Sequence, residues 1–99
     1  MKAPVDWQGR ADWASLHIAS MFGNTDIVML LIEGKANLNV PNLVGDTPLI
    51  LAATANEMTA VRALKEAGAD LTIMGDDNKT AAEKAQQKGN NAIVEYLKQ

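Results

Sequence analysis

Apolar residues in this chain recur at the spacing of short helices, not in long runs or in strict alternation. In the windows 26–33, 58–67 and 92–98 they fall three and four positions apart, as one face of a helix requires. Helices this short are not stable alone, so we expect these faces to pack against neighbouring helices. The positions are Ile27, Leu30 and Leu31, then Ala60, Ala63 and Leu64, then Ile93, Tyr96 and Leu97.

The pattern repeats along the chain with a fixed step of 33 residues and without gaps. A repeat of this kind indicates that similar units stack on one another and share a core. We place the units near residues 9–41, 42–74 and 75–99 of a single domain. The step aligns Val28 with Val61 and Val94, Leu31 with Leu64 and Leu97, and residues 36–38 with 69–71.

Local signals mark where helices begin and where they turn. Thr47 is a good N-cap, and Pro48 follows at the first helical position, where its missing N–H costs nothing. Thr80 and Glu83 have the spacing of a capping box. Tight turns are predicted at the residues that tolerate a left-handed backbone, namely Gly23, Asn56 and Gly89.

The period and the motifs together resemble the ankyrin repeat. The resemblance covers residues 9–99 and implies an all-α solenoid of helix-turn-helix units joined by hairpin loops. The family pattern is divided among the copies. The second unit supplies Gly45, Thr47, Pro48 and Leu49, the loop matches at residues 68–70, and the first unit supplies Leu16, His17, Ala19, Gly23, Ile27, Val28, Leu30 and Leu31.

Departures from the pattern fall at the two ends of the predicted stack. Lys35 stands where the second unit has Gly68, so either Gly34 takes the left-handed position or Lys35 does, at about 1 kcal/mol of strain. The third unit is polar on a side that an inner unit would bury, which is typical of a C-terminal cap. Its polar residues are Glu83, Lys84, Gln86, Gln87 and Lys88.

The first unit carries Met29 and Ile32 where the second has Arg62 and Lys65. Three alternatives stay open for what covers this pair: the segment 1–7, a partner, or a further repeat. The pair also predicts self-association of the chain.

Composition narrows the classes of function. The chain has 99 residues, no Cys, one His and a net charge of −3. Disulfides and thiolate zinc sites are therefore excluded, and a nucleic-acid footprint or an anionic membrane surface is disfavoured. The longest apolar run, 27–32, is too short to span a bilayer, and residues 1–7 do not read as a signal peptide. We expect a cytoplasmic protein without cofactors.

His17 is the obvious candidate for catalysis, yet the resemblance implies a structural role, in which its ring bonds to the backbone of a neighbouring loop. Asp76 and Asp77 are interpreted as a solvated hairpin tip, because no calcium-loop spacing follows them. No set of nucleophile, base and orienting group is visible, so an enzyme is not expected.

A binding surface is the better candidate. In ankyrin proteins, partners dock on the hairpin tips and on the exposed side of the first helices. We expect one contiguous apolar patch here, with Trp13 as its main anchor. The alternative is that Trp13 and Phe22 pack on each other at the N-terminal end. The predicted partner-binding residues are Arg10, Trp13, Met21, Phe22, Leu43, Val44 and Asp46.

These patterns predict a non-catalytic module that binds a protein partner on its hairpin and concave face. Two alternatives stay open: an engineered or reconstructed ankyrin scaffold, and a fragment of a longer ankyrin protein.

Overall fold

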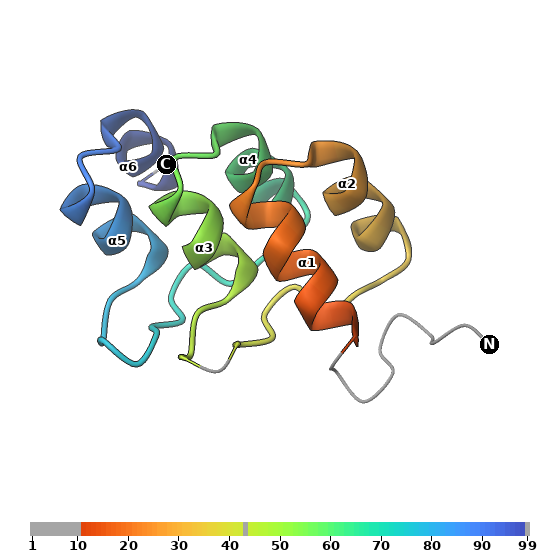
Figure 1. Ribbon diagram of the computed structural model, residues 1–99. Helices are drawn as coiled ribbons and strands as arrows, with labels where there is room; N and C mark the ends of the chain where they lie inside the picture. Colours follow the sequence, from red (N-terminus) through yellow and green to blue (C-terminus); the bar gives the residue numbers. More distant parts are fainter. Residues whose placement is uncertain (1–10, 43, 99) are drawn as a thin grey trace.

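The computed structural model describes residues 11–42 and 44–98, with the side chains of residues 11–14 also outside the description. These residues form helices stacked in two layers, with α1, α3 and α5 in one layer and α2, α4 and α6 in the other (Figure 1). The all-α stack of helix pairs is thus confirmed. The helices are α1 (Ala11–Met21), α2 (Thr25–Glu33), α3 (Pro48–Thr54), α4 (Met58–Glu66), α5 (Ala81–Gln87) and α6 (Asn91–Leu97).

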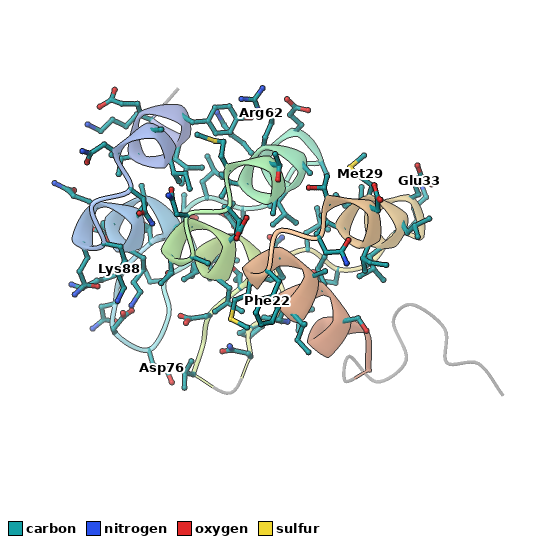
Figure 2. All side chains as sticks on the ribbon, turned by 45° about the horizontal axis from the view of Figure 1, so that its top comes forward. Phe22, Met29, Glu33, Arg62, Asp76 and Lys88 are labelled. Carbon is teal, nitrogen blue, oxygen red and sulfur yellow. The ribbon has the colours of Figure 1, made fainter. Side chains whose placement is uncertain are left out.

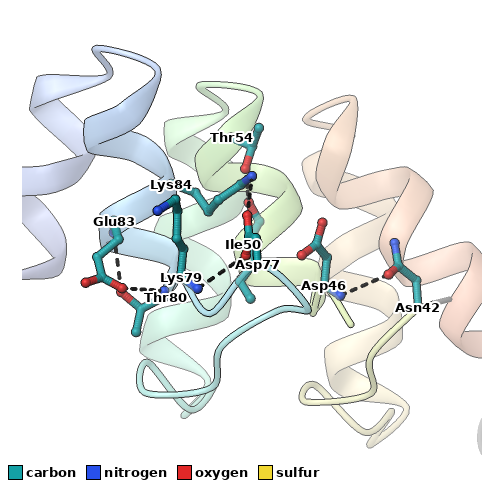
Figure 3. Close-up of polar contacts among 9 residues, drawn as sticks. All are labelled: Asn42, Asp46, Ile50, Thr54, Asp77, Lys79, Thr80, Glu83 and Lys84. Atoms are coloured by element: carbon teal, nitrogen blue, oxygen red, sulfur yellow. Dashed lines mark hydrogen bonds and ion pairs between the residues drawn. The ribbon is translucent and has the colours of Figure 1, made fainter. Parts of the chain in front are cut away.

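The predicted caps explain where α3 and α5 begin. The Ile50 N–H donates to Thr47 Oγ1 at 3.3 Å, and Pro48 occupies the first position of α3. At α5, the Glu83 N–H donates to Thr80 Oγ1 at 3.3 Å, and the Thr80 N–H donates to Glu83 Oε1 at 2.9 Å (Figure 3). The capping box is therefore confirmed, and it satisfies backbone donors that a helix start leaves unpaired.

The turns between paired helices use the left-handed backbone as expected, with φ of 71° at Gly23, 63° at Asn56 and 77° at Gly89. The loop that follows α2 settles the choice between Gly34 and Lys35. Gly34 has φ of −79° and Lys35 has φ of 67°, so the lysine takes the strained conformation.

The core runs the length of the stack as a row of equivalent residues. Val28 and Val61 are fully buried and Val94 nearly so, which is the 33-residue step expressed in packing. Leu16 and Leu49, at matching positions of α1 and α3, are also buried. Burying side chains of this size stabilises the fold by about 1.5–3 kcal/mol each, and only adjacent repeats can provide that burial.

The two ends of the stack differ, and one expectation was wrong there. Ile27 and Leu30 are 38% and 62% exposed, although their spacing placed them on a packed helical face. The equivalents of Ile27 in the later repeats, Ala60 and Ile93, are 0% exposed because a preceding repeat lies over them. No described residue covers the first repeat in this way. At the other end, the exposed side of the third repeat is polar, with Glu83, Gln86 and Lys98.

Candidate protein-binding surface

The hairpin that follows the first repeat is built around one amide side chain. Asn42 Oδ1 accepts from the Val44 N–H at 3.0 Å. It also accepts from the Asp46 N–H at 2.9 Å (Figure 3). The Asn42 N–H donates in turn to the Asp46 carbonyl at 2.9 Å. These bonds hold the turn without help from a sheet, so the exposed side chain of Val44 is presented by an ordered backbone.

His17 fixes this hairpin to the first helix. Its ring is 4% exposed, and Nε2 lies 3.0 Å from the Asp46 carbonyl oxygen. Because a carbonyl oxygen only accepts, Nε2 is the donor in this contact. The predicted structural role of His17, a bond to the backbone of a neighbouring loop, is confirmed.

The second hairpin packs directly against the first. The Asp76 N–H donates to the Val44 carbonyl at 3.1 Å, which joins the two loops by their backbones. A Cβ atom at Gly45 would lie 2.9 Å from the Asp76 nitrogen, and Gly45 has φ of 81°. Glycine is therefore required here both by close approach and by backbone conformation. The two loops form one continuous edge along the base of the stack.

The acidic residues on this edge differ in their charge environment. Lys84 Nζ lies 2.8 Å from Asp77 Oδ2, and this hydrogen-bonded ion pair lowers the pKa of Asp77 and raises the pKa of Lys84. Asp46 behaves in the opposite way. Its partial burial raises the pKa of its carboxyl group, and Asp77 and Asp76 add to the rise, while Lys84 and His17 only partly oppose it. The edge is therefore acidic, with one carboxylate already neutralised by a lysine.

Four residues of the predicted patch have described side chains. Val44 is 56% exposed on the hairpin, and Asp46 and Met21 are half-buried. Met21 lies one helical turn from His17 on the side that faces the second repeat. Phe22 is 70% exposed, but it lines a groove with Ile18 and Ile27 at the open end of the stack.

Phe22 is labelled apart from Asp76 in Figure 2, and it lines the open-end groove, so its place in one contiguous apolar patch with Val44 stays a prediction. Helical rotation of about 100° between adjacent residues turns Met21 and Phe22 to different sides. Arg10 and Leu43 lie outside the described residues, as does the side chain of Trp13. Their predicted roles, and the packing of Trp13 on Phe22, stay predictions.

Two apolar surfaces were missed by the sequence reasoning. The first is the open-end groove of about 330 Å³, where Ile18 is 54% exposed. The sequence carries a signal for this groove, because Ile18 is apolar where the third unit has Lys84 at the matching position. Helical spacing alone does not show that Ile18 lies at the end of the stack. The second is Met74, which is 53% exposed just before the second hairpin.

Met29 and Ile32 are separated by packing. Ile32 is partly buried against the core, whereas Met29 is 41% exposed. Met29 lines a shallow groove of about 480 Å³ between α2 and α4, together with Met58 and Arg62. Self-association through this pair stays a prediction, with Met29 as its accessible member.

Sites for other chemistry were sought in the same part of the chain. Within residues 11–42 and 44–98, no group of three or more His, Cys, Asp or Glu side chains is arranged to hold a metal ion. None of the helices described above is long and apolar enough to cross a membrane.

Comparisons with known proteins agree with the repeat architecture. A model of ankyrin repeats matches residues 9–99 as three copies. A putative ankyrin repeat protein of Rickettsia bellii is 42% identical over 99 residues, which cover 94% of this chain and 59% of that protein.

Two other relatives are much longer proteins. A glycerophosphocholine phosphodiesterase of Candida albicans is 36% identical over 84 residues, 84% of this chain and 7% of its own length. Inversin of Gallus gallus is 37% identical over 85 residues, 85% of this chain and 8% of its own. The chain thus spans less than two thirds of each of these relatives. On the repeat pattern, the stacked helix pairs and the family match, the chain belongs to the ankyrin repeat family.

Proposed function

We propose that the chain is a non-catalytic module that binds a protein partner on the edge formed by its two hairpins and the adjoining side of α1 and α3. Ankyrin repeat domains generally mediate protein binding, which supports the class of function. The observation that carries the choice of face is the backbone bond of 3.1 Å between the Asp76 N–H and the Val44 carbonyl. It ties the two loops into one edge, so little conformational entropy is lost when a partner docks.

The composition of this edge supports a protein as the ligand. Val44 and Met74 are exposed apolar residues on the two linked loops, and exposed carboxylates of Asp76 and Asp77 lie beside them. An apolar centre with a polar rim is the usual anatomy of a protein interface. Asp77 is already paired with Lys84, so Asp46 and Asp76 are the acidic groups that favour a partner with a basic rim, and they would mainly raise its association rate.

The test is a capture experiment with the full chain immobilised and three variants compared. Val44→Lys places a charge at the proposed centre, and its exposure means that folding is retained. Met29→Lys makes the same change in the groove between α2 and α4, here called the outer groove, and serves as the matched control. We expect partners identified by mass spectrometry to be lost from the Val44 variant and kept by the Met29 variant.

Trp13→Ala is the third variant, since Trp13 was predicted as the main anchor. A loss of binding with an unchanged unfolding temperature supports that role. Partners that persist on Val44→Lys and disappear on Met29→Lys would instead assign binding to the outer groove and refute the proposed face.

A further inference from the structure

The open end of the first repeat presents an apolar surface that is separate from the hairpin edge. Ile18, Phe22, Ile27 and Leu30 are all exposed there, and the first three of them line a groove of about 330 Å³. Patches of large exposed apolar side chains are uncommon on soluble proteins and mark docking sites. We define the end face as Ile18, Phe22, Asn24, Ile27 and Leu30.

The chain itself shows what covers such a face, because the third repeat carries the same residues at two matching positions. Ile93 matches Ile27 and is fully buried by the second repeat. Asn90 matches Asn24, and its Nδ2 donates to the carbonyls of Ala53 at 2.8 Å and Thr54 at 3.3 Å.

These two carbonyls end α3, where the backbone hydrogen bonds of the helix stop. The Ala53 carbonyl also accepts from the Asn56 N–H at 3.3 Å, so Asn90 adds a further donor there. Asn90 thus recognises the C-terminal end of the first helix of the repeat ahead of it. Asn24 has the same amide at the open end. Its Oδ1 accepts from the Ile27 N–H at 3.4 Å, so its Nδ2 is the atom that can donate to a further acceptor.

Charge adds an independent argument. Leu30 matches Tyr96, and the second repeat sets two cations over that ring, with Lys65 Nζ at 4.4 Å and the Arg62 guanidinium at 5.5 Å from its centroid. Lys65 Nζ also donates to the Tyr96 carbonyl at 3.1 Å. In the first repeat, Asp26 and Glu33 flank Leu30 on the same stripe of α2, four and three residues away. Figure 2 shows Glu33 at this end of the stack.

We propose that the end face docks a helical hairpin of the ankyrin type, carried by a partner protein, with a contact side like the one the second repeat turns toward the third. Its small apolar residues would cover Ile27 and Leu30. The carbonyls that end its first helix would accept from Asn24 Nδ2, as those of Ala53 and Thr54 accept from Asn90. A Lys or Arg on its second helix would pair with Asp26 and Glu33.

A second copy of this chain fits the end face less well. Its own outer side carries Glu83 and Gln86 where the second repeat has Ile50 and Ala53, so head-to-tail stacking would bury a charge. Head-to-head pairing would bring two sets of Asp26 and Glu33 carboxylates together. Both arrangements are therefore outcomes that the experiment must separate from the proposal.

The probe is this full chain with the outer side of its third repeat changed to match the second. Val94, Leu97 and Lys98 already equal their counterparts in the second repeat. Leu30→Lys and Ile18→Lys place charges on the probe's own end face, so that the probe does not bind through it. The remaining substitutions are Ala82→Leu, Glu83→Ile, Gln86→Ala and Glu95→Arg.

Sedimentation of equimolar probe and parent, each shown to be folded by circular dichroism, decides the question. We expect a 1:1 complex that weakens at least tenfold with parent Leu30→Lys and about two- to tenfold with parent Asn24→Ala, the effect of one hydrogen bond. Parent Met29→Lys is the matched control and should bind as the parent does. No complex at high micromolar concentration would overturn the proposal, and so would a parent that dimerises by itself through Leu30.

A second measurement keeps the proposal open to refutation if the probe does not fold. Residues 42–74 are duplicated ahead of residue 9, in register with the repeat. We expect one cooperative unfolding transition at a higher temperature than the parent's, and Leu30→Lys should lower it in the extended chain but hardly in the parent. Equal effects of Leu30→Lys in both chains would show that the end face does not accept a hairpin.

Discussion

The two ends of the stack are each formed by one pair of helices, but their outward surfaces are opposite in character. At the C-terminal end, Glu83, Gln86 and Lys98 face outward, and the helix contacts behind them are made by small residues such as Ala81 and Ala85. At the N-terminal end, Ile18 and Leu30 face outward instead. A capped repeat can end a stack in water, whereas an apolar end face gains free energy whenever a neighbour covers it.

Ile27 and Ile93 show that the difference lies in the neighbours and not in the residues. They are the same amino acid at the same position of the repeat, 38% exposed in one case and fully buried in the other. Burial in a stacked protein is therefore set by place in the stack as well as by helical face. Each of the predictions below compares a residue with its counterpart or with the opposite end.

The largest expected difference is in the unfolding free energy lost by Ile93→Ala and by Ile27→Ala. Truncation at the fully buried Ile93 leaves a cavity between the second and third repeats and should cost about 2–5 kcal/mol of unfolding free energy. The same change at the exposed Ile27 should cost less than about 1 kcal/mol, since most of that surface already meets water. Urea unfolding of both variants measures the pair, and equal losses would mean that the end face is covered in solution.

A smaller difference in unfolding free energy is expected between alanine substitutions of Asn90 and Asn24. Asn90→Ala removes both bonds to the carbonyls that end α3 and should cost about 1–2 kcal/mol. Asn24→Ala removes only a 3.4 Å bond to the Ile27 N–H and should cost about 0.5 kcal/mol. Thermal unfolding of the two variants provides the comparison. A larger loss at Asn24 than at Asn90 would contradict the inter-repeat role assigned to this position.

Much of the fold could be predicted from local chemistry. Thr47, Pro48, Thr80 and Glu83 determine helix starts through bonds within a few residues of themselves, and the 33-residue step fixed which helices pair. The structural role of His17 followed from the family resemblance.

The candidate site was harder to predict, because exposure depends on residues far apart in the sequence. Helical spacing alone marks Ile27 and Leu30 as packed, and it cannot show that no repeat lies ahead of them among the described residues. The grouping of Phe22 with Val44 stays a prediction, because the period gives the spacing between repeats but not the side of α1 on which a residue lies. The join between the hairpins, from Asp76 to Val44, depends on backbone geometry that side-chain patterns do not carry.

The loops that close the second helices allow a third comparison. Lys35 and Gly68 match in the repeat and both have positive φ, 67° and 99°. Lys35→Gly should raise the unfolding free energy by up to about 1 kcal/mol, because glycine adopts this conformation without steric strain, and the gain is reduced by the greater freedom of glycine in the unfolded chain. The measurement is the urea midpoint, with exposed Lys98→Gly as the control for loss of charge. A loss of stability would show that contacts of the lysine outweigh its strain.

The smallest expected effects come from pH and concern the ion pair at the polar end, where Lys84 replaces the Ile18 of the open end. The hydrogen bond from Lys84 lowers the pKa of Asp77, so its contribution is present above the unfolded pKa of about 3.9 and is lost as pH falls through the folded value. Burial raises the pKa of Asp46, so the contribution of this carboxyl group to folding stability has the opposite sign. It is present when the carboxyl is protonated and is lost as pH rises through the folded value.

Relative to the parent, Asp77→Asn should therefore be less stable at neutral pH, and its stability should fall less toward acidic pH. Asp46→Asn should be at least as stable as the parent at neutral pH, and its stability should fall more steeply toward acidic pH. Unfolding temperatures measured from neutral to acidic pH test both signs, and parallel curves for the two variants would show that neither carboxyl is linked to folding in the way the hairpin edge requires.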